Sequence, residues 1–449
     1  MSAGPSATRR ALRADLLDFC GEPGLGTPDA NVVRYRPDHW LLIDDGRIVD
    51  AVAAAQPPGG DWAREDHRGR LLLPGFIDTH VHSVQLDVIA SHGAELLEWL
   101  ERYTFPAEAR HADAAHASTQ AEAFADALLA HGTTAAVVFP SVHATSVNAL
   151  FAAAQRRGMR VVTGKVLMDR HAPEGLRDDV ARAQSDSEAL IARWHGIDLL
   201  AYAVTPRFAA TSSPEQLTMA GALLERHPGL YMQTHVAENR AEVAWIAQLF
   251  PQARSYLDVY HHHGLLNERA VLAHGIWLDN ADRALLADSG AQIAHSPSSN
   301  LFLGSGLFDW QAMASARAAV SLASDVGGGT SLSMVRTMAD AYRVQALRGV
   351  RLSAFKALHT ATLGAAQALK LDREIGSLEP GRMADFTVWD WAVGPVAASR
   401  DALARDLHER LFAWMMLGDE RNLVTTVVAG RTQYRRRGDD SGAKVGDAP

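Results

Sequence analysis

Residues that form covalent or metal cross-links through sulfur are almost absent, because the 449-residue chain contains one cysteine, Cys20. An internal disulfide is therefore excluded, and so is any metal site that needs two or more thiolates from one chain. Lysine is also scarce and is present only as Lys165, Lys356, Lys370 and Lys444. No apolar run approaches the roughly 20 residues that a membrane-spanning helix requires, so we expect no membrane association.

The charge distribution argues against a nucleic-acid partner, because the formal net charge is −9 and no basic stripe is present. The hydrophobic fraction of 47% and the charged fraction of 21% are those of an ordinary globular protein. Arg9 and Arg10 could begin an export signal, but Arg13, Asp15 and Asp18 interrupt any apolar stretch behind them. We therefore expect no signal peptide and a cytoplasmic location.

The middle of the chain alternates short apolar runs with amphipathic, helix-like stretches, such as residues 114–130 and 214–226. This alternation predicts βαβ units and a parallel sheet, and eight such units predict a closed (β/α)8 barrel of the α/β class. The eight runs are residues 71–81, 133–139, 160–168, 199–204, 230–235, 270–274, 291–294 and 319–323. Further strand-like segments lie near both ends of the chain.

Five side chains of metal-binding type stand at or just beyond the ends of these runs, namely His80, His82, His235, His274 and Asp325. Barrel enzymes carry their catalytic groups at the carboxyl ends of the strands, so these side chains are expected to meet at one mouth. Residues i and i+2 of a strand share a face, which allows His80 and His82 to meet one ion. Imidazole and carboxylate ligands favour Zn2+, with Fe2+ as the alternative ion.

The sequence PGFIDTHVH at residues 74–82 resembles the first-strand signature of the amidohydrolase superfamily. His235, His274 and Asp325 stand at the positions of the other metal ligands of that superfamily. The resemblance implies a TIM-like barrel accompanied by a small β-sandwich that is built from both chain ends. We accordingly expect residues 1–73 and 375–449 to form the sandwich and tail, and residues 74–374 to form the barrel.

Some members of the superfamily hold two metal ions bridged by a carboxylated lysine. Lys165 is the only lysine near an early strand end, and it lies several residues before the end of its run. We interpret Lys165 as structural and expect one metal ion per subunit, as in the nucleobase deaminases.

The sequence THVAEN places Glu238 three residues after His235, which resembles the fifth-strand signature of metal-dependent purine and pyrimidine deaminases. A bound metal ion activates water, and a neighbouring carboxyl group can shuttle the protons that deamination requires. We assign that shuttle to Glu238; the alternative is that Glu238 only caps the following helix. Asp325 is expected to accept a proton from the water, and His274 to bind the metal or the water. The other zinc deaminase design needs P-C-x-x-C, which Cys20 alone cannot supply.

Several longer stretches resemble the guanine deaminase family. They are residues 80–85, 96–100, 103–108, 165–169, 205–208, 298–301 and 324–329. The resemblance implies that Gln85 and Arg207 hydrogen-bond a purine, and an amide and a guanidinium do match the polar edges of guanine. Phe208 is expected to stack on the base, and Trp99 either closes the pocket or belongs to the core.

The sequence departs from that family where cysteines are frequent, because Ser212 or Ser213 and Ser296 stand near those places. We expect the fold to tolerate the change, since the two side chains are nearly isosteric. His295 is interpreted as a neighbour of the site that does not bind the metal. The glycines at residues 327–329 lack the lysine of a phosphate-binding loop, and we interpret them as a flexible loop near the ligand.

The expected reaction is the hydrolytic deamination of guanine to xanthine and ammonia. The near alternatives are a related aminopurine or azaheterocycle, such as 8-oxoguanine or an aminotriazine. A non-catalytic scaffold is the alternative from another class, and it predicts missing metal ligands, whereas the sequence retains all five. The family resemblance also implies a homodimer.

Overall fold

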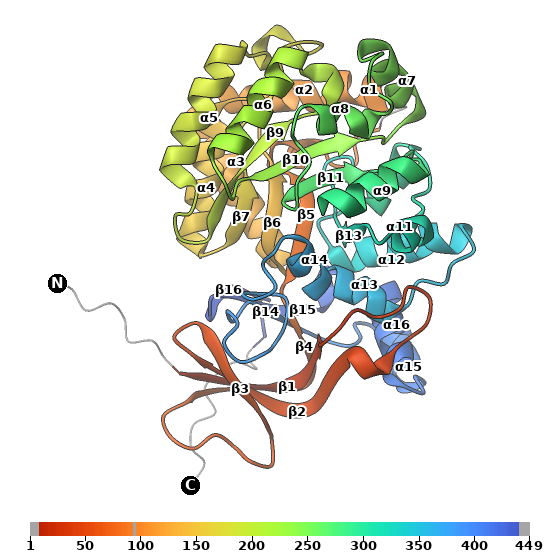
Figure 1. Cartoon of the computed structure of the whole chain (residues 1–449). Helices are drawn as coiled ribbons and strands as arrows, with labels where there is room; N and C mark the ends of the chain where they lie inside the picture. Colours follow the sequence, from red (N-terminus) through yellow and green to blue (C-terminus); the bar gives the residue numbers. More distant parts are fainter. Residues whose placement is uncertain (1–8, 93–95, 440–449) are drawn as a thin grey trace, which may run out of the picture.

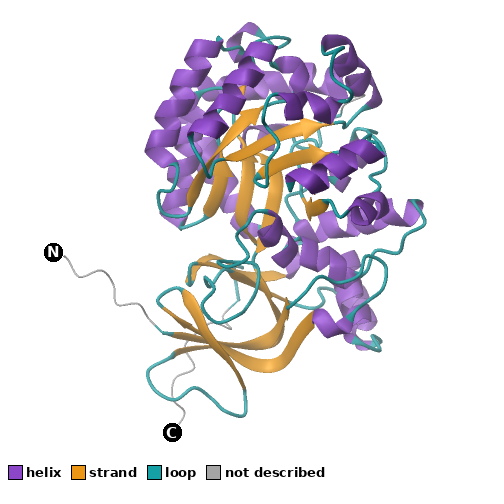
Figure 2. Cartoon of the chain, in the orientation of Figure 1, coloured by secondary structure: helices purple, strands orange, loops and turns teal. Residues whose placement is uncertain are grey.

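Two β-sheets form the framework of the molecule, which the computed structural model describes over residues 9–92 and 96–439 (Figures 1 and 2). The larger sheet is a barrel with helices on its outside, and the smaller sheet lies at one end of the molecule. Among the described helices, none is long and apolar enough to cross a membrane.

The barrel consists of eight parallel strands that are neighbours in the order in which they follow along the chain, as predicted. The strands are β5 (Phe76–His82), β6 (Thr133–Phe139), β7 (Arg160–Thr163), β9 (Leu200–Pro206), β10 (Tyr231–Val236), β11 (Ala270–His274), β12 (Gln292–His295) and β13 (Ala319–Leu322). A short strand, β8 (Val166–Leu167), pairs with β9 outside this path.

The first and last barrel strands are joined by hydrogen bonds at their carboxyl ends. The hydroxyl of Thr79 donates to the carbonyl of Leu322 (2.9 Å), and the Asp325 N–H donates to the carbonyl of His80 (2.9 Å). The His82 N–H donates to the carbonyl of Val326 (2.7 Å). The barrel is therefore nearly closed, and the chain after β13 is held against the end of β5.

Helices cover the outer face of the barrel and follow its strands in sequence. In α5 (Val180–Trp194) the buried residues recur at helical spacing, Ala183, Ser187, Leu190, Ile191 and Trp194, so one stripe packs on the barrel. Further helices of the barrel are α3 (Ala114–Ala130), α4 (Ala144–Arg157), α6 (Pro214–Arg226), α7 (Arg240–Leu249), α9 (Asn280–Ser289) and α12 (Met334–Leu347). The remaining helices are α1 (Leu96–Trp99), α2 (Phe105–Ala109), α8 (Tyr256–His262), α10 (Pro297–Phe302), α11 (Trp310–Ala316), α13 (Ala354–Thr360), α14 (Leu363–Ala368), α15 (Pro395–Ala402) and α16 (Leu407–Leu417).

The smaller sheet combines strands from both ends of the chain, as the family resemblance implied. Its order is β16-β15-β14-β4-β1-β2-β3, and β14 pairs antiparallel with β4. Its strands are β1 (Arg10–Phe19), β2 (Val33–Asp44), β3 (Arg47–Ala53), β4 (Ala63–Pro74), β14 (Phe386–Trp389), β15 (Leu423–Val428) and β16 (Arg431–Arg435). Leu12, Leu41, Leu72, Phe386 and Val424 belong to one buried cluster on this sheet, so both chain ends share a core.

The apolar run at residues 71–81, which was predicted to form one barrel strand, contributes to strands of two different sheets. The small-sheet strand β4 ends at Pro74, and the barrel strand β5 begins at Phe76. The Gly75 N–H donates to the carbonyl of Asp385, and the next N–H, of Phe76, donates to the carbonyl of Gly132. A Cβ on Gly75 would lie 2.1 Å from the Thr134 hydroxyl oxygen, so only glycine fits where the chain changes sheets.

Candidate active site

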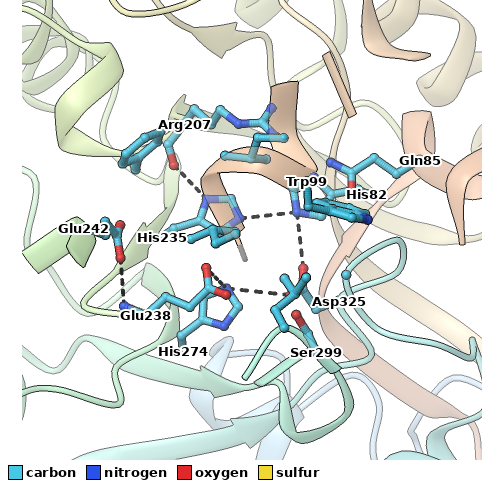
Figure 3. A pocket seen from close by; sticks show the side chains of 15 residues that line it. His82, Gln85, Trp99, Arg207, His235, Glu238, Glu242, His274, Ser299 and Asp325 are labelled. Atoms are coloured by element: carbon cyan, nitrogen blue, oxygen red, sulfur yellow. Dashed lines mark hydrogen bonds and ion pairs between the residues drawn. The ribbon is translucent and has the colours of Figure 1, made fainter. Parts of the chain in front are cut away.

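The five side chains predicted as metal ligands lie at or just beyond the carboxyl ends of the barrel strands, and Figure 3 shows four of them, His82, His235, His274 and Asp325. One ligand atom each from His80, His235, His274 and Asp325 lies within 4.8 Å of all the others. The Nε2 atom of His82 lies 3.3 Å from Asp325 Oδ1 and 3.3 Å from His235 Nε2, so this fifth side chain adjoins the group.

Two of the imidazoles are oriented by acceptors behind them. His235 Nδ1 lies 2.7 Å from the carbonyl oxygen of Arg207, and a carbonyl can only accept, so Nδ1 carries the hydrogen. His274 Nδ1 lies 2.8 Å from Asn300 Oδ1 and donates to it in the same way. In both rings the lone pair is consequently on Nε2, which faces the centre of the group. Metal-binding histidines are typically held in this manner.

The protonation states of the group suit a divalent cation. Burial lowers the pKa of His82 to about 4 and holds the pKa of His235 well below its ordinary value, so both rings are neutral. Burial by itself would raise the pKa of Asp325, but the neighbouring His80 and His82 hold that pKa well below its usual range. Neutral imidazole and ionised carboxylate are the forms that bind metals. The buried His80 Nε2 lies 3.1 Å from Asp325 Oδ1 without a well-aligned hydrogen bond, an arrangement that fits two atoms facing one cation.

Glu238 lies immediately beside the cluster. Its Oε2 atom is 3.4 Å from His274 Nε2, and its Oε1 atom accepts a hydrogen bond from the Ser305 hydroxyl at 2.9 Å. Burial and the negative charge of Asp325 raise the pKa of Glu238 to about 8, although the Ser305 hydrogen bond opposes this shift. In the metal-free chain this carboxyl group therefore carries a proton near neutral pH, beside the predicted metal ligands.

The helix-capping alternative for Glu238 is wrong, because the following residues cap α7. Asn239 is the N-cap residue, and Glu242 completes a capping box. Glu242 was not among the predicted site residues, yet its Oε2 atom accepts the N–H groups of Glu238 (3.0 Å) and Asn239 (3.2 Å). The Tyr256 hydroxyl donates to its other oxygen at 2.7 Å. The pattern Asn-x-x-Glu before an apolar stretch was the signal in the sequence that marks this residue.

A cavity of about 440 Å³ opens beside the cluster and is lined by all four of the predicted substrate-binding residues, Gln85, Trp99, Arg207 and Phe208. Its walls combine apolar side chains with a few polar groups, as in cavities that bind small ligands. Trp99 is 2% exposed and also packs in a buried cluster with Leu96 and Leu100. The two alternatives for Trp99, pocket wall and core, thus apply together.

Glu108 lies behind Gln85 and Arg207, the two polar residues predicted to bind the substrate, and was not itself predicted as a site residue. Arg207 Nη1 lies 2.8 and 2.7 Å from the two carboxylate oxygens of Glu108. Gln85 Nε2 donates to Glu108 Oε1 at 2.9 Å, and the Gly327 N–H donates to Gln85 Oε1 at 3.1 Å. Glu108 is completely buried and belongs to α2, which follows directly after the segment that carries Trp99.

The glycines at residues 327–329, which we expected to form a loop near the ligand, form a tight turn, and Gly328 lines the cavity. A Cβ on Gly329 would lie 1.8 Å from the carbonyl oxygen of Ser324, and a Cβ on Gly327 would lie 2.8 Å from that of Gln85. The Gly329 N–H donates to the carbonyl of Asp325 at 2.5 Å. The turn after β13 is therefore packed against the site, where it fixes the backbone of Asp325.

Two other residues singled out in the sequence lie outside the cluster. Lys165 is buried and forms an ion pair with Asp178, so it has a partner away from the metal-binding side chains. Burial lowers the pKa of Lys165 to about 8. His295 stacks on Phe308, with ring centroids 4.4 Å apart, and is not one of the clustered groups.

The serines that replace family cysteines all have hydrogen-bond acceptors. The Ser212 hydroxyl donates to the carbonyl of Leu167, and the Ser296 hydroxyl donates to the carbonyl of Ala294, each at 3.3 Å. Ser213 is the N-cap residue of α6. Because each hydroxyl is satisfied, the fold accommodates serine at these places.

Comparison with known proteins places this architecture in a family. The model of the Amidohydrolase family matches residues 71–432. The chain belongs to this family. It is 40% identical over 440 residues to the guanine deaminase of Escherichia coli, which covers 96% of this chain and 98% of the relative. A probable guanine deaminase of Deinococcus radiodurans is also 40% identical, over 95% of this chain and 99% of the relative.

Solved structures of family members agree with the fold over nearly the whole chain. The structure of E. coli guanine deaminase matches with a TM-score of 0.91 and covers 95% of this chain and 100% of that one. A guanine deaminase from C. acetobutylicum, solved with guanine in its active site, matches with a TM-score of 0.85 at 26% identity. It covers 95% of this chain and 100% of that one.

Proposed function

We propose that the chain catalyses the hydrolytic deamination of guanine to xanthine and ammonia with one zinc ion per subunit. The observation that carries the proposal is the meeting, in one cavity, of a cluster able to bind a metal ion, the buried carboxyl group of Glu238 and the pair Gln85 and Arg207. The relatives that are 40% identical over nearly their full lengths are named guanine deaminases, which supports the same substrate.

The metal would be held by the imidazoles of His80, His82, His235 and His274 and by the carboxylate of Asp325. These nitrogen and oxygen donors suit Zn2+, with Fe2+ as the second choice. When bound, such an ion acts as a Lewis acid and makes water nucleophilic near neutral pH.

The protons of the reaction are assigned to the two carboxyl groups. Water adds to the ring carbon that bears the amino group, and Asp325 accepts a proton from it. Glu238 gives a proton to the adjacent ring nitrogen. The proton on Asp325 then passes to the amino group, the new hydroxyl group on the carbon returns a proton to Glu238, and the carbon–nitrogen bond breaks as the carbonyl forms and ammonia leaves. The proton count balances because one proton of the water ends on ammonia and the other replaces the proton that Glu238 gave to the ring nitrogen.

The base would be oriented by side chains on the opposite wall of the cavity. Gln85 and Arg207 provide the polar contacts, Phe208 an aromatic surface, and Trp99 a cover on the apolar side. This places the amino-bearing carbon toward Glu238 and the metal-binding cluster.

The decisive experiment measures the absorbance of guanine and the release of ammonia with zinc-loaded protein. Adenine, cytosine, 8-oxoguanine and an aminotriazine serve as competing substrates, and Glu238→Gln is the matched variant. We expect guanine to react fastest, and Glu238→Gln to lower kcat by at least about 100-fold while it retains zinc. Turnover of another base in preference to guanine would refute the substrate, and zinc binding without turnover of any base would refute the deaminase.

We further infer that the protein is a cytoplasmic homodimer, as the family resemblance implies. Light scattering of the purified protein tests the oligomeric state, and a monomer at micromolar concentration would contradict it. The division into a barrel and a terminal domain at residues 74 and 374 also stays a prediction, to be tested by limited proteolysis.

A further inference from the structure

We propose that Glu108 is a positioning residue that makes the pocket specific for a purine with an oxygen at position 6. Glu108 fixes the orientation of the Gln85 amide and of the Arg207 guanidinium, so that both present hydrogen-bond donors to the base. The inference rests on the proposed function, because it concerns how the same cavity distinguishes guanine from other 2-aminopurines.

The first step concerns the polarity of the Gln85 amide. Its Nε2 atom donates to the Glu108 carboxylate at 2.9 Å, and its Oε1 atom accepts from the Gly327 N–H at 3.1 Å. An ionised carboxylate can only accept and a backbone N–H can only donate. A flipped amide would set oxygen against oxygen and N–H against N–H, so only one orientation is compatible with both neighbours.

The second step concerns the Arg207 guanidinium, which is 2% exposed. Its Nη1 atom contacts both oxygens of Glu108, which supplies the buried cation with a counter-charge. The ring of Phe105, on the same helix α2, lies 5.3 Å from the guanidinium carbon. One short helix therefore holds Arg207 both through charge and through ring contact.

The third step is the hydrogen-bonding pattern that remains for a ligand. Arginine carries five N–H donors and no acceptor, and Glu108 occupies only part of this set. Gln85 Nε2 retains a second N–H after the bond to Glu108. Both residues line the cavity, so this wall presents an excess of donors to the ligand.

A 6-oxopurine complements that wall, whereas a 6-aminopurine does not. Guanine offers two neighbouring acceptors, O6 and N7, but a purine with an amino group at position 6 places a donor beside N7. Glu108 sets this preference without contacting the base, because it determines which atoms of Gln85 and Arg207 are turned toward it.

The test compares guanine with 2,6-diaminopurine, which carries the same reacting 2-amino group and differs at position 6. The ratio of kcat/KM for the two bases is measured for zinc-loaded wild type and Glu108→Gln. The control is Glu101→Gln, a change at an exposed glutamate of the preceding segment. We expect wild type and the control to prefer guanine, and Glu108→Gln to lower that preference about 10-fold or more, because its amide permits Gln85 to flip.

Glu108→Asp provides a second variant, since it keeps an acceptor-only carboxylate but withdraws it by one methylene. Its preference for guanine is expected to lie between those of wild type and Glu108→Gln. In the Glu238→Gln background, calorimetric binding of the two bases measures the same discrimination without turnover.

The outcomes separate the inference from the proposed function. If wild type deaminates guanine but neither Glu108 variant changes the ratio, Glu108 is only structural and the inference is wrong. An equal loss with both bases has the same meaning. If wild type neither binds nor deaminates guanine, the proposed function fails, and the inference falls with it.

Discussion

At the scale of single residues, hydrogen bonds to partners outside the cavity determine which atoms the site side chains turn toward the cavity. The carbonyl of Arg207 sets the His235 ring, Asn300 sets the His274 ring, and Glu108 sets the Gln85 amide. Each partner lies behind the residue that it orients. Substitutions of Asn300 or Glu108 should therefore change affinity or selectivity without removing a side chain that is proposed to contact the metal or the base.

Asn300→Ala is predicted to weaken zinc binding. The substitution removes the acceptor of the His274 Nδ1 hydrogen at 2.8 Å, so the ring can turn and its tautomer is no longer fixed. Loss of such a partner typically lowers metal affinity by about 10- to 100-fold. Competition with a chromophoric chelator measures the dissociation constant, and Asn280→Ala, at an exposed position, is the control. Equal affinities for the two variants would contradict the prediction.

The stability of the metal-free wild type, measured relative to Glu238→Gln, is predicted to fall as the pH rises from 6.5 to 8. The pKa of Glu238 is raised to about 8 in the folded chain, whereas an unfolded glutamate has its ordinary value. The folded state therefore holds a proton that the unfolded state has released, and this stabilisation disappears as the pH approaches 8. The loss amounts to about 1–2 kcal/mol over this interval.

Denaturant unfolding of metal-free wild type and Glu238→Gln at both pH values measures this effect. Buried histidines with lowered pKa values release protons only from the unfolded state near pH 6.5, so they raise the stability of both proteins with pH, and only the difference between the two proteins isolates Glu238. Glu242, whose pKa burial and Glu238 raise to about 7, also titrates in both proteins. The same pH dependence in both proteins would show that Glu238 is ionised in the folded state.

At the scale of elements, the ends of strands and helices supply the precision of the site. His274 ends β11 and Asp325 follows β13, and both have left-handed backbones, with φ of 72° and 50°. Residues in this conformation cluster at functional sites, where the surrounding structure maintains them. Here the Gly329 N–H donates to the carbonyl of Asp325, and the N–H of Gly275, directly after His274, donates to the carbonyl of Val236.

Gly329→Ala is predicted to reduce both zinc occupancy and activity, because its Cβ would lie 1.8 Å from the carbonyl oxygen of Ser324. Backbone atoms cannot give way as a flexible side chain can, so the turn that carries Asp325 must shift. Gly175→Ala is the control, since its Cβ would meet no atom within 4 Å. Metal analysis and kcat/KM of the two purified variants provide the measurement; full zinc content in Gly329→Ala would contradict the prediction.

The sequence was sufficient for the elements that carry the metal-binding side chains, because buried strands produce continuous apolar runs with the ligands at their ends. Glu108 could not be predicted in this way. It stands on a short helix, 23 positions from Gln85 and 99 from Arg207, and only the folded barrel brings the three together. Glu242 could have been predicted from the sequence, since a capping box is a local pattern. The change from the small sheet to the barrel at Gly75 could not be predicted, because apolar residues continue on both sides of it.

At the scale of the whole molecule, the two sheets share one core. Leu17 of β1, Leu73 of β4 and Trp389 of β14 belong to the same buried cluster as Phe76 and many residues of the barrel. The Trp389 ring lies 5.5 Å from that of Phe76 and 5.4 Å from that of Trp414. We therefore expect the barrel and the small sheet to unfold together.

Trp389→Ala is predicted to destabilise the entire chain by about 3–5 kcal/mol, because it empties a completely buried position between the sheets. Urea unfolding followed by far-UV circular dichroism and by loss of bound zinc should give coincident transitions in wild type and in the variant. Val396→Ala, at a side chain that is 73% exposed, should change the stability little. Separate transitions for the two signals would show that the sheets fold independently.

The five metal-binding side chains are spread from His80 to Asp325, and the hydroxyl of Thr79 reaches the carbonyl of Leu322 only when the last barrel strand has joined the first. During synthesis on the ribosome, the histidines of β5 and β10 emerge long before Asp325. A nascent chain consequently holds an incomplete set of ligands until translation has passed the eighth strand. Premature termination anywhere upstream should yield a fragment that fails to retain zinc, so metal retention would distinguish finished molecules from abortive ones.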